Sequence, residues 1–479
     1  MAISSLEKAL THHIRIFLIS NFTVSKLKKA AFIISLFTCL FAGSVLIISL
    51  FTPYFTKNLG YSQITINLIG SFIALGMYLP LPLLGYLADL HGPVLLAVIS
   101  MILFCPGYYV AAFTFQNNLS YWYMCFSYLM IGCATSALYF SSLLSCAKIY
   151  PDYKGLSISA PVTCYGLSSL ILSQLTKLDI FQKKIPNTKD DYELDIYKLF
   201  TFFSILYFAL SAFNWVSSAI VSIERDIIFS NQTTSQLSTT EQTPLLTDDL
   251  DPVPDENLVI DHKLKFKNFL KDKSMYLLLA SLFLCIGPLE MFITNMGSLI
   301  SVIGVETQVD ISTQVSVHAT ASTLTRLIMG GLSDLLSNLN KYPICRVYLL
   351  AFILICGIVG SILISLNYNN FTIISALFGT SYGGVFTLYP TILANIWGVE
   401  IFGSTWGLFM LSPSLGSIFY GLLYGFRFDR YCQLHIGSDK AYNCLSLTFL
   451  LISGGMFLSM VIVFICWKLI WVKRGFIVF

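Results

Sequence analysis

The sequence predicts an all-α membrane protein with twelve transmembrane helices in two six-helix halves, and three observations lead to this fold class. Only 11 % of the 479 residues are charged and 56 % are hydrophobic, whereas a soluble domain carries about 25 % charged residues. The hydrophobic residues form blocks of 18 or more, close to the roughly 20 residues that a membrane-spanning helix requires. Finally, two short motifs recur at a constant spacing in the two halves of the chain. The composition excludes a soluble enzyme, a disordered chain and a disulfide-rich scaffold.

Twelve apolar segments follow one another along the chain, with polar residues or Gly/Pro punctuation between them. They cover residues of about 30–52, 64–87, 94–115, 121–147, 155–176, 199–223, 275–302, 313–333, 346–366, 371–394, 403–425 and 446–470. The fourth and the seventh segment are long enough that we expect them to tilt or bend. The pattern indicates six spans, a long linker and six more spans.

The spans divide the chain into five parts. We expect an N-terminal arm (1–29), a first six-helix bundle (30–223), a linker (224–274), a second six-helix bundle (275–470) and a tail (471–479). Residues 226–262 contain eight acids and no Lys or Arg, so the linker is predicted to be disordered. The arm has helically spaced apolar residues, and two interpretations remain open for it: a helix on the membrane surface or a disordered tail.

The distribution of basic residues predicts the orientation in the membrane, because cytoplasmic loops carry an excess of Lys and Arg. If the N-terminus is cytoplasmic, that side holds 18 basic residues and the opposite side holds nine. Both termini and the linker are therefore predicted to be cytoplasmic. Five lysines between residues 263 and 273 are expected to bind the anionic headgroups of the bilayer.

A repeated motif follows spans two and eight. Gly85 and Asp89 stand in the first copy, and Gly330 and Asp334 stand 245 residues later in the second. The runs 132–155 and 379–403 match at an offset of 247 to 248 residues. Two matches at nearly one offset predict a duplicated six-helix unit whose halves are related by an axis along the membrane normal.

The residue types of this motif favour a conformational latch. Glycine lets two helices approach closely, and an aspartate at the end of a span can accept hydrogen bonds from the N-terminus of a neighbouring helix. The predicted latch residues are Gly85, Asp89, Gly330 and Asp334. The motif resembles the loop motif of the major facilitator superfamily, although Leu90, Pro93 and Val94 stand where that family has basic residues. The resemblance implies the major facilitator fold and secondary transport by alternating access.

Two charged residues lie well inside apolar segments, Glu290 in span seven and Arg326 in span eight. A charge at the centre of a span costs about 2.5–3.5 kcal/mol or more, so both should face a cavity or each other. Pro288 should bend span seven beside Glu290. Because a buried acid can exchange protons and a fixed guanidinium can hold an anion, we expect a transport site here. A structural role in helix packing is the alternative for each residue.

The polar residues of span eight recur every four positions. His318, Ser322 and Arg326 therefore lie on one face of a helix. The predicted substrate and ion pathway consists of Glu290, Asn295, His318, Ser322 and Arg326.

A narrower resemblance covers most of the chain outside two loops. The segments 75–79, 136–141, 287–293, 295–299, 382–384 and 389–391 resemble the fungal monocarboxylate transporter homologues of the vacuolar membrane. The resemblance implies a vacuolar transporter of a small solute, for which an anion is one candidate and protons are a candidate coupling ion. Arg326 resembles the arginine of span eight that holds the substrate carboxylate in monocarboxylate transporters. Ser322 replaces the aspartate that those proteins carry one turn earlier.

The linker contains a short sequence that resembles an acidic dileucine sorting signal. Glu241 precedes Leu245 and Leu246 by three intervening residues. In such signals a carboxylate and two exposed leucines bind a coat adaptor, so we expect a coat adaptor as a partner and delivery to the vacuolar membrane.

Two of the twelve cysteines lie in the loop between spans eleven and twelve. Cys432 and Cys444 are predicted to face an oxidising lumen, where they could form a disulfide bond. The remaining cysteines are interpreted as small apolar residues of the spans.

Other functions find little support in the sequence. It contains no Gly-x-x-x-x-Gly-Lys-Ser/Thr loop, so we expect no ATP-driven mechanism. With a net charge of +3 and no basic face, we expect no nucleic-acid partner. No cofactor, no metal and no enzymatic activity are predicted. A membrane-embedded sensor or receptor without transport, and a multi-span membrane enzyme, are the alternatives.

Overall fold

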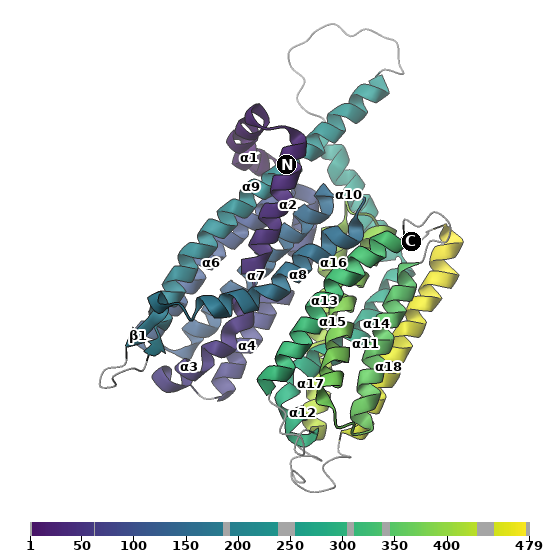
Figure 1. The fold of residues 1–479 in the computed structure, drawn as a ribbon. Helices are drawn as coiled ribbons and strands as arrows, with labels where there is room; N and C mark the ends of the chain where they lie inside the picture. Colours follow the sequence, from purple (N-terminus) through teal and green to yellow (C-terminus); the bar gives the residue numbers. More distant parts are fainter. Residues whose placement is uncertain are drawn as a thin grey trace. The chain divides into compact units, whose positions relative to one another are not determined.

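The computed structural model describes residues 2–61, 63–184, 192–237, 254–303, 311–337, 345–428 and 445–475. Within these ranges the chain is almost entirely helical (Figure 1).

The described residues of the first half fold into nine α-helices, two 3₁₀ turns and a small hairpin. In order, they are α1 (Ala2–Asn21), α2 (Val24–Phe41), η1 (Ser44–Leu50), α3 (Thr52–Leu59), α4 (Gln63–Tyr78), α5 (Leu81–His91), α6 (Val94–Asn117), α7 (Tyr121–Ile149), α8 (Lys154–Leu175), η2 (Asp179–Phe181), β1 (Gln182–Lys184), β2 (Tyr192–Leu194) and α9 (Ile196–Leu237).

The remaining described residues fold into a linker helix and the helices of the second half. They are α10 (Pro254–Lys271), α11 (Lys273–Thr294), α12 (Met296–Ile303), α13 (Ile311–Ser337), α14 (Arg346–Ser365), α15 (Phe371–Ile396), α16 (Phe402–Phe409), α17 (Leu411–Arg427), α18 (Ser446–Ile465), the π-helical η6 (Cys466–Trp471) and η7 (Val472–Arg474).

By length and composition, eleven helical stretches of the described residues can cross a membrane. The predicted eighth span corresponds to α13, which is long enough with 27 residues but is more polar than the others. Its polarity comes from a buried face that carries Gln314, His318, Ser322 and Arg326. A polar face that is covered by neighbouring helices does not meet lipid, so it is compatible with a span.

Three details differ from the predicted segments. The first segment breaks after α2, where Gly43 precedes the 3₁₀ turn η1, and the seventh divides into α11 and α12 at Asn295. A two-stranded antiparallel hairpin, with Gln182 opposite Leu194, forms in a predicted loop.

The predicted disordered linker contains helix at both ends. α9 continues to Leu237, and α10 covers Pro254–Lys271. The structure thus differs from the sequence interpretation over residues 224–237 and 254–274. The prediction of disorder relied on the acidic composition and did not consider the helical spacing of the apolar residues in α10.

The described chain forms two compact units. Unit 1 consists of Met1–Tyr150, Leu167–Asn268 and Glu400–Ser404, and unit 2 consists of Pro151–Gly166, Phe269–Val399 and Thr405–Phe479. Each unit therefore includes a short segment, 400–404 or 151–166, from the opposite half of the sequence. The bundle boundaries at residues 30, 223, 275 and 470 remain predictions.

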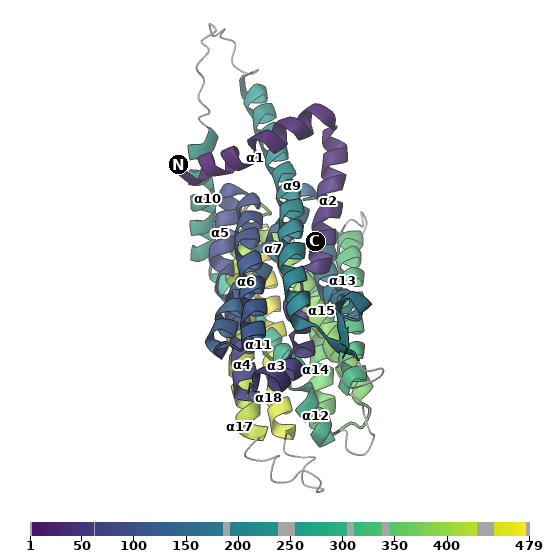
Figure 2. The same ribbon diagram turned by 90° about the vertical axis from the view of Figure 1, so that its left-hand side faces the viewer.

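In unit 1, α6 packs against α7 and α9, while α2 and α4 also pack against α7. Stacked aromatic rings fill its centre, with the Phe104 and Tyr207 centroids 4.3 Å apart. Serine pairs link the helices, such as Ser35 and Ser217 with an Oγ–Oγ distance of 2.8 Å. Figure 2 shows α1 running across the end of α2 rather than continuing it.

In unit 2, α15 packs against α13 and α14, and α11 packs against α17 and α18. A buried hydroxyl network links three of these helices, because Ser281 of α11 contacts Tyr389 of α15 at 2.6 Å and Ser459 of α18 at 2.8 Å. Such buried hydroxyl groups must be paired in an apolar bundle, so the network fixes the positions of the helices.

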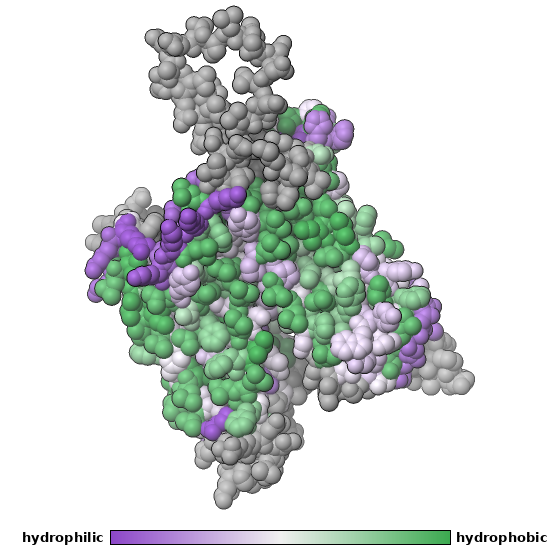
Figure 3. All heavy atoms as spheres, turned by 180° about the vertical axis from the view of Figure 1, so that it is seen from behind, coloured by the Kyte–Doolittle hydropathy of each residue, from purple (hydrophilic) through white to green (hydrophobic). Residues whose placement is uncertain are grey.

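Hydrophobic residues cover much of the face that Figure 3 shows, where they are coloured green. Leu366 and Leu422 are both 70 % exposed, and Ile205 is 67 % exposed. A surface that exposes so many large apolar residues is suited to contact with lipid rather than water.

Candidate functional site

Two glycines of α15 allow α13 to approach closely and bring the polar face of α13 into unit 2. A Cβ atom at Gly383 would lie 2.2 Å from the carbonyl oxygen of Ser322, and one at Gly379 would lie 2.5 Å from that of His318. Only glycine therefore fits at these two positions. As a result His318, Ser322 and Arg326 are all buried, with 5–7 % of their surface exposed.

Tyr382 of α15 connects the two charged residues. Its hydroxyl donates a hydrogen bond to Oε1 of Glu290 at 3.0 Å, and its ring centroid lies 5.7 Å from Cζ of Arg326. The ring of Phe386 lies 6.0 Å from the same Cζ. Among the described residues, Glu290 and Arg326 form no ion pair with each other, so the tyrosine stands between an acid and a cation.

The Arg326 side chain is anchored through NH1. NH1 donates a hydrogen bond to the carbonyl oxygen of Val162 at 2.8 Å. A Cβ atom at Gly166 would lie 2.8 Å from this NH1, so the guanidinium occupies space that a glycine leaves open. The Nε atom of Arg326 is buried and has no hydrogen-bond partner in the described part of the chain.

His318 lies beside this group and completes a cluster of four side chains that we call the central cluster: Glu290, His318, Arg326 and Tyr382. The His318 ring lies 5.7 Å from that of Tyr382 and 6.2 Å from that of Phe292. Its Nε2 atom is buried and unpaired within the described ranges. The cluster therefore offers a carboxylate, a guanidinium and unpaired nitrogen atoms at one place in unit 2.

Asn295 and Ser322 have a different setting from the rest of the predicted pathway. Asn295 caps the end of α11, where its Nδ2 donates to the carbonyl oxygen of Met291 at 3.0 Å. Ser322 is buried at the contact with Gly383. The sequence interpretation did not include Tyr382 in the pathway, although a hydroxyl-bearing residue beside two glycines in an apolar span is a usable signal.

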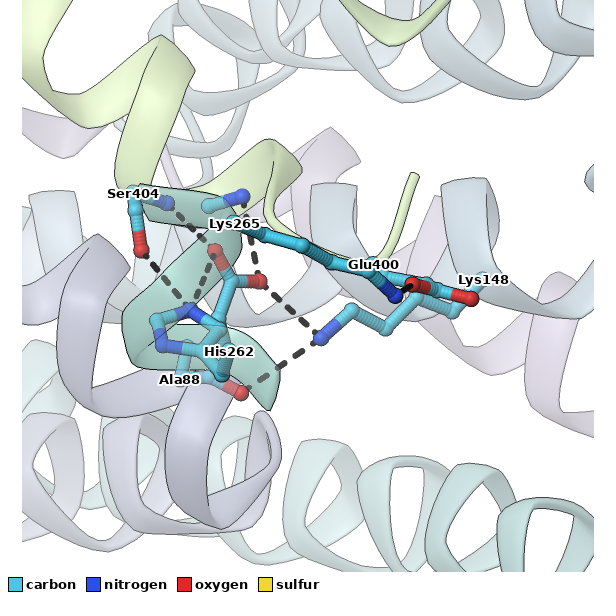
Figure 4. Close-up of polar contacts among 8 residues, drawn as sticks. Ala88, Lys148, His262, Lys265, Glu400 and Ser404 are labelled. Atoms are coloured by element: carbon cyan, nitrogen blue, oxygen red, sulfur yellow. Dashed lines mark hydrogen bonds and ion pairs between the residues drawn. The ribbon is translucent and has the colours of Figure 1, made fainter. Parts of the chain in front are cut away.

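The first predicted latch residue, Asp89, lies in unit 1 at the N-terminus of α16. Its Oδ1 accepts a hydrogen bond from the backbone N–H of Gly403 at 3.1 Å, and its Oδ2 accepts one from Ser404 at 2.5 Å. The Nζ atom of Lys148 lies 3.1 Å from Oδ1, and Figure 4 shows it beside the carbonyl oxygen of Ala88. A Cβ atom at Gly85 would lie 1.9 Å from the carbonyl oxygen of Gly403.

The second predicted latch residue, Asp334, has the corresponding position in unit 2. It accepts hydrogen bonds from the backbone N–H groups of Gly155 and Leu156, both at 2.8 Å. NH2 of Arg346 lies 3.0 Å from its Oδ1. A Cβ atom at Gly330 would meet Ser159 at 1.9 Å, so this helix contact also requires glycine.

Both sites use a basic residue that the sequence interpretation missed. Lys148 and Arg346 replace the basic residues that the loop motif lacks after its aspartate. Their position at the ends of apolar segments was the only available signal, since they lie 59 and 12 residues from the aspartates that they contact. His262 of α10, treated as a linker residue, also lies at the Asp89 site.

Several predicted residues lie outside the described residues. They are Glu241, Leu245 and Leu246 of the dileucine sequence, and Cys432 and Cys444 of the predicted disulfide. Within the described ranges, no group of three or more His, Cys, Asp or Glu side chains could hold a metal ion.

Comparisons with known proteins identify the family. Residues 32–178 match the model of the Major Facilitator Superfamily. The probable transporter MCH1 of Wickerhamomyces anomalus is 52 % identical over 94 % of this chain and 89 % of its own. That of Saccharomyces cerevisiae is 32 % identical over 98 % of this chain and 99 % of its own. The chain belongs to the major facilitator superfamily. Within this superfamily it groups with the fungal probable transporters named MCH1.

Solved structures of major facilitator superfamily proteins share the fold. The proton:xylose symporter XylE matches with a TM-score of 0.63 and 12 % identity, over 93 % of this chain and 96 % of its own. The Escherichia coli fucose:proton symporter FucP matches with a TM-score of 0.55 and 12 % identity, over 89 % of this chain and 97 % of its own. At this identity the likeness carries the fold alone.

These findings confirm the predicted fold class and the general function. The chain is a multi-pass membrane protein of a transporter superfamily, and it is a secondary transporter rather than an enzyme.

Proposed function

We propose that the chain carries a small anionic solute across the fungal vacuolar membrane by alternating access, with the central cluster as its binding site. The observation that carries this proposal is the buried guanidinium of Arg326. It is 7 % exposed, its NH1 donates to the carbonyl oxygen of Val162, and its Nε has no hydrogen-bond partner among the described residues. A buried cation with an unused donor is suited to bind an anion.

The acid of the cluster supports coupling to protons. Glu290 receives a hydrogen bond from Tyr382, so a proton that enters the cluster has a carboxylate to bind and a hydroxyl to stabilise it. Ionisable residues inside membrane spans commonly serve proton or ion pathways. Two proteins of similar fold, XylE and FucP, are described as proton symporters, which is compatible with this role.

We propose that the Asp89 and Asp334 sites act as latches in the transport cycle. In each, an aspartate caps the N-terminus of a helix and is paired with a base. Charge-assisted hydrogen bonds to a helix N-terminus are among the stronger polar contacts. They can hold one arrangement of the helices and yet be broken, because each consists of only a few contacts.

The solute is best found by comparing the metabolites of vacuoles with and without the protein. A small anion whose vacuolar content changes is the expected result, and its flux into vesicles that contain the purified protein should then be measured. A neutral solute would contradict the role of Arg326. A lack of any flux would favour a receptor.

The vacuolar location rests on the sequence resemblance and on the dileucine sequence. Replacing Leu245 and Leu246 together with alanine should move a fluorescent fusion to the cell surface or to endosomes. Replacing Leu237 and Leu250, two leucines outside the motif, provides the control. Vacuolar fluorescence that persists in the Leu245/Leu246 variant would contradict the sorting role. Tags at both termini that stay accessible on the cytoplasmic side of intact vacuoles would support the proposed orientation.

We also propose a disulfide bond between Cys432 and Cys444 in the vacuolar lumen. Alkylation before and after reduction, followed by mass spectrometry, tests this bond. Two additional labelled thiols after reduction are expected, whereas full labelling without a reductant would refute the bond.

A further inference from the structure

The linker helix α10 contacts the Asp89 site through one face. His262 on this face is 6 % exposed, while Lys263 and Lys267 on the other face are exposed. The ring of Tyr86, on the helix α5 that carries Asp89, lies 5.3 Å from the His262 ring and 5.4 Å from the Phe266 ring. The linker helix is therefore part of the site rather than a passive tether.

His262 lies beside both Asp89 and Ser404, the residue whose backbone N–H is capped by Asp89. Its Nε2 lies 3.3 Å from Oγ of Ser404 and 3.9 Å from Oδ2 of Asp89. Figure 4 shows the His262 ring beside Ser404. Ser404 is the same residue whose backbone N–H donates to Asp89. The Nδ1 atom of His262 is buried and accepts no hydrogen bond from a described residue, so it is available for a second proton.

The charged groups that face this ring come from three helices and from the turn before α16. Two cations and three anions leave one net negative charge, which a proton on the ring would neutralise. Both cations have anionic partners of their own. Lys148 is paired with Asp89, and Lys265 is paired with Asp261 and Glu400. The facing charged groups are Asp89 of α5, Lys148 of α7, Asp261 and Lys265 of α10, and Glu400 just before α16.

The Asp334 site differs at this point. Its aspartate is paired with Arg346, whose Nε also donates to Ser333 at 2.7 Å, and Lys154 lies near enough to interact with the same aspartate. An arginine stays charged at every physiological pH. Histidine is the side chain that changes charge between about pH 5 and 8. Within the described residues, Asp334 is therefore paired with a permanently charged arginine. Asp89 is paired with Lys148 and lies beside a histidine, which can gain or lose a charge.

We infer that His262 is a positioning residue of the transport cycle, which holds the first turn of α16 on Asp89 more firmly when its ring is protonated. This inference rests on the proposed function in one respect, the role of the Asp89 site as a latch. The linker helix thereby makes that latch sensitive to the pH on its own side of the membrane. A charge added 3.9 Å from the carboxylate is expected to strengthen the contact about fivefold, the upper end of the range measured for exposed ion pairs.

Hydrogen exchange of the full-length protein in detergent micelles tests the inference without any substrate. The amides of Gly403 and Ser404 should exchange about fivefold more slowly at pH 5.5 than at pH 7.5, after division by the intrinsic exchange rates. In His262→Gln this pH dependence should disappear. His12→Gln, which changes an exposed histidine of α1, should behave like the wild type.

The amides of Gly155 and Leu156 at the Asp334 site provide an internal control in the same sample. Their protection should not respond to His262→Gln. Equal pH dependence in the wild type and His262→Gln would overturn the inference, and so would a loss of protection at both sites, which indicates a general loss of stability. Because no flux is measured, a failure of the proposed transport function would leave this result unchanged.

Discussion

Replacing Gly383 with alanine should loosen the α13–α15 contact that positions the central cluster. The added Cβ atom would lie 2.2 Å from the carbonyl oxygen of Ser322, and ordinary contacts begin at 3.4 Å, so the helices must separate by about 1.2 Å. Overpacking of this kind costs about 1–3 kcal/mol, while the higher helix propensity of alanine returns about 0.5–1 kcal/mol. We therefore expect a net loss of roughly 1 kcal/mol, the difference between the midpoints of these two ranges.

The matched control is Gly331→Ala in α13, where an added Cβ atom has nothing within 4 Å. Thermal unfolding in detergent micelles should show a lower midpoint for Gly383→Ala and an unchanged or slightly higher midpoint for Gly331→Ala. Arg326 lies one turn beyond Ser322, so Gly383→Ala should also weaken solute binding. Equal midpoints for the two variants would refute the close helix contact on which the geometry of the site depends.

Two further predictions concern single polar contacts. Although burial raises it, the pKa of Asp272 is lowered below its usual value by hydrogen bonds from the first turn of α11 and by the Arg474 ion pair. This contribution to stability is therefore complete above the unfolded-state pKa of about 4 and is lost as the pH falls through the lower folded-state value. Asp272→Asn should accordingly destabilise the protein at pH 7 but not at pH 2, and an equal effect at both would contradict the ion pair. Tyr382→Phe removes a donor from the half-buried Glu290 and should cost about 1–3 kcal/mol, whereas Tyr276→Phe, at an exposed hydroxyl, should cost less when both are compared by thermal unfolding.

Much of the fold could be predicted from the sequence because the bilayer imposes simple rules. Apolar blocks and the repeated Gly and Asp residues were sufficient to place the spans and the aspartates. The same aspartates then lie at helix N-termini in the structure, since glycines at the contact points leave room for the backbone.

The partners of these residues could not be predicted, because they are distant in sequence. Tyr382 lies 92 residues from Glu290, and Val162 lies 164 residues before Arg326. A contact between residues so far apart in the sequence produces no periodic pattern within a single helix. The linker misled the interpretation for another reason: its acidic composition indicated disorder, whereas the buried face of α10 depends on a few residues such as His262 and Phe269.

The central claim is that the charges of Glu290 and Arg326 serve transport rather than folding. The most direct measurement is the flux of the identified solute into vesicles that contain Glu290→Gln, Arg326→Gln or Lys177→Gln, the last being an exposed control. We predict that all three variants fold with wild-type yield and that only Lys177→Gln retains flux. Wild-type flux in Glu290→Gln or Arg326→Gln, or degradation of either protein, would contradict the claim.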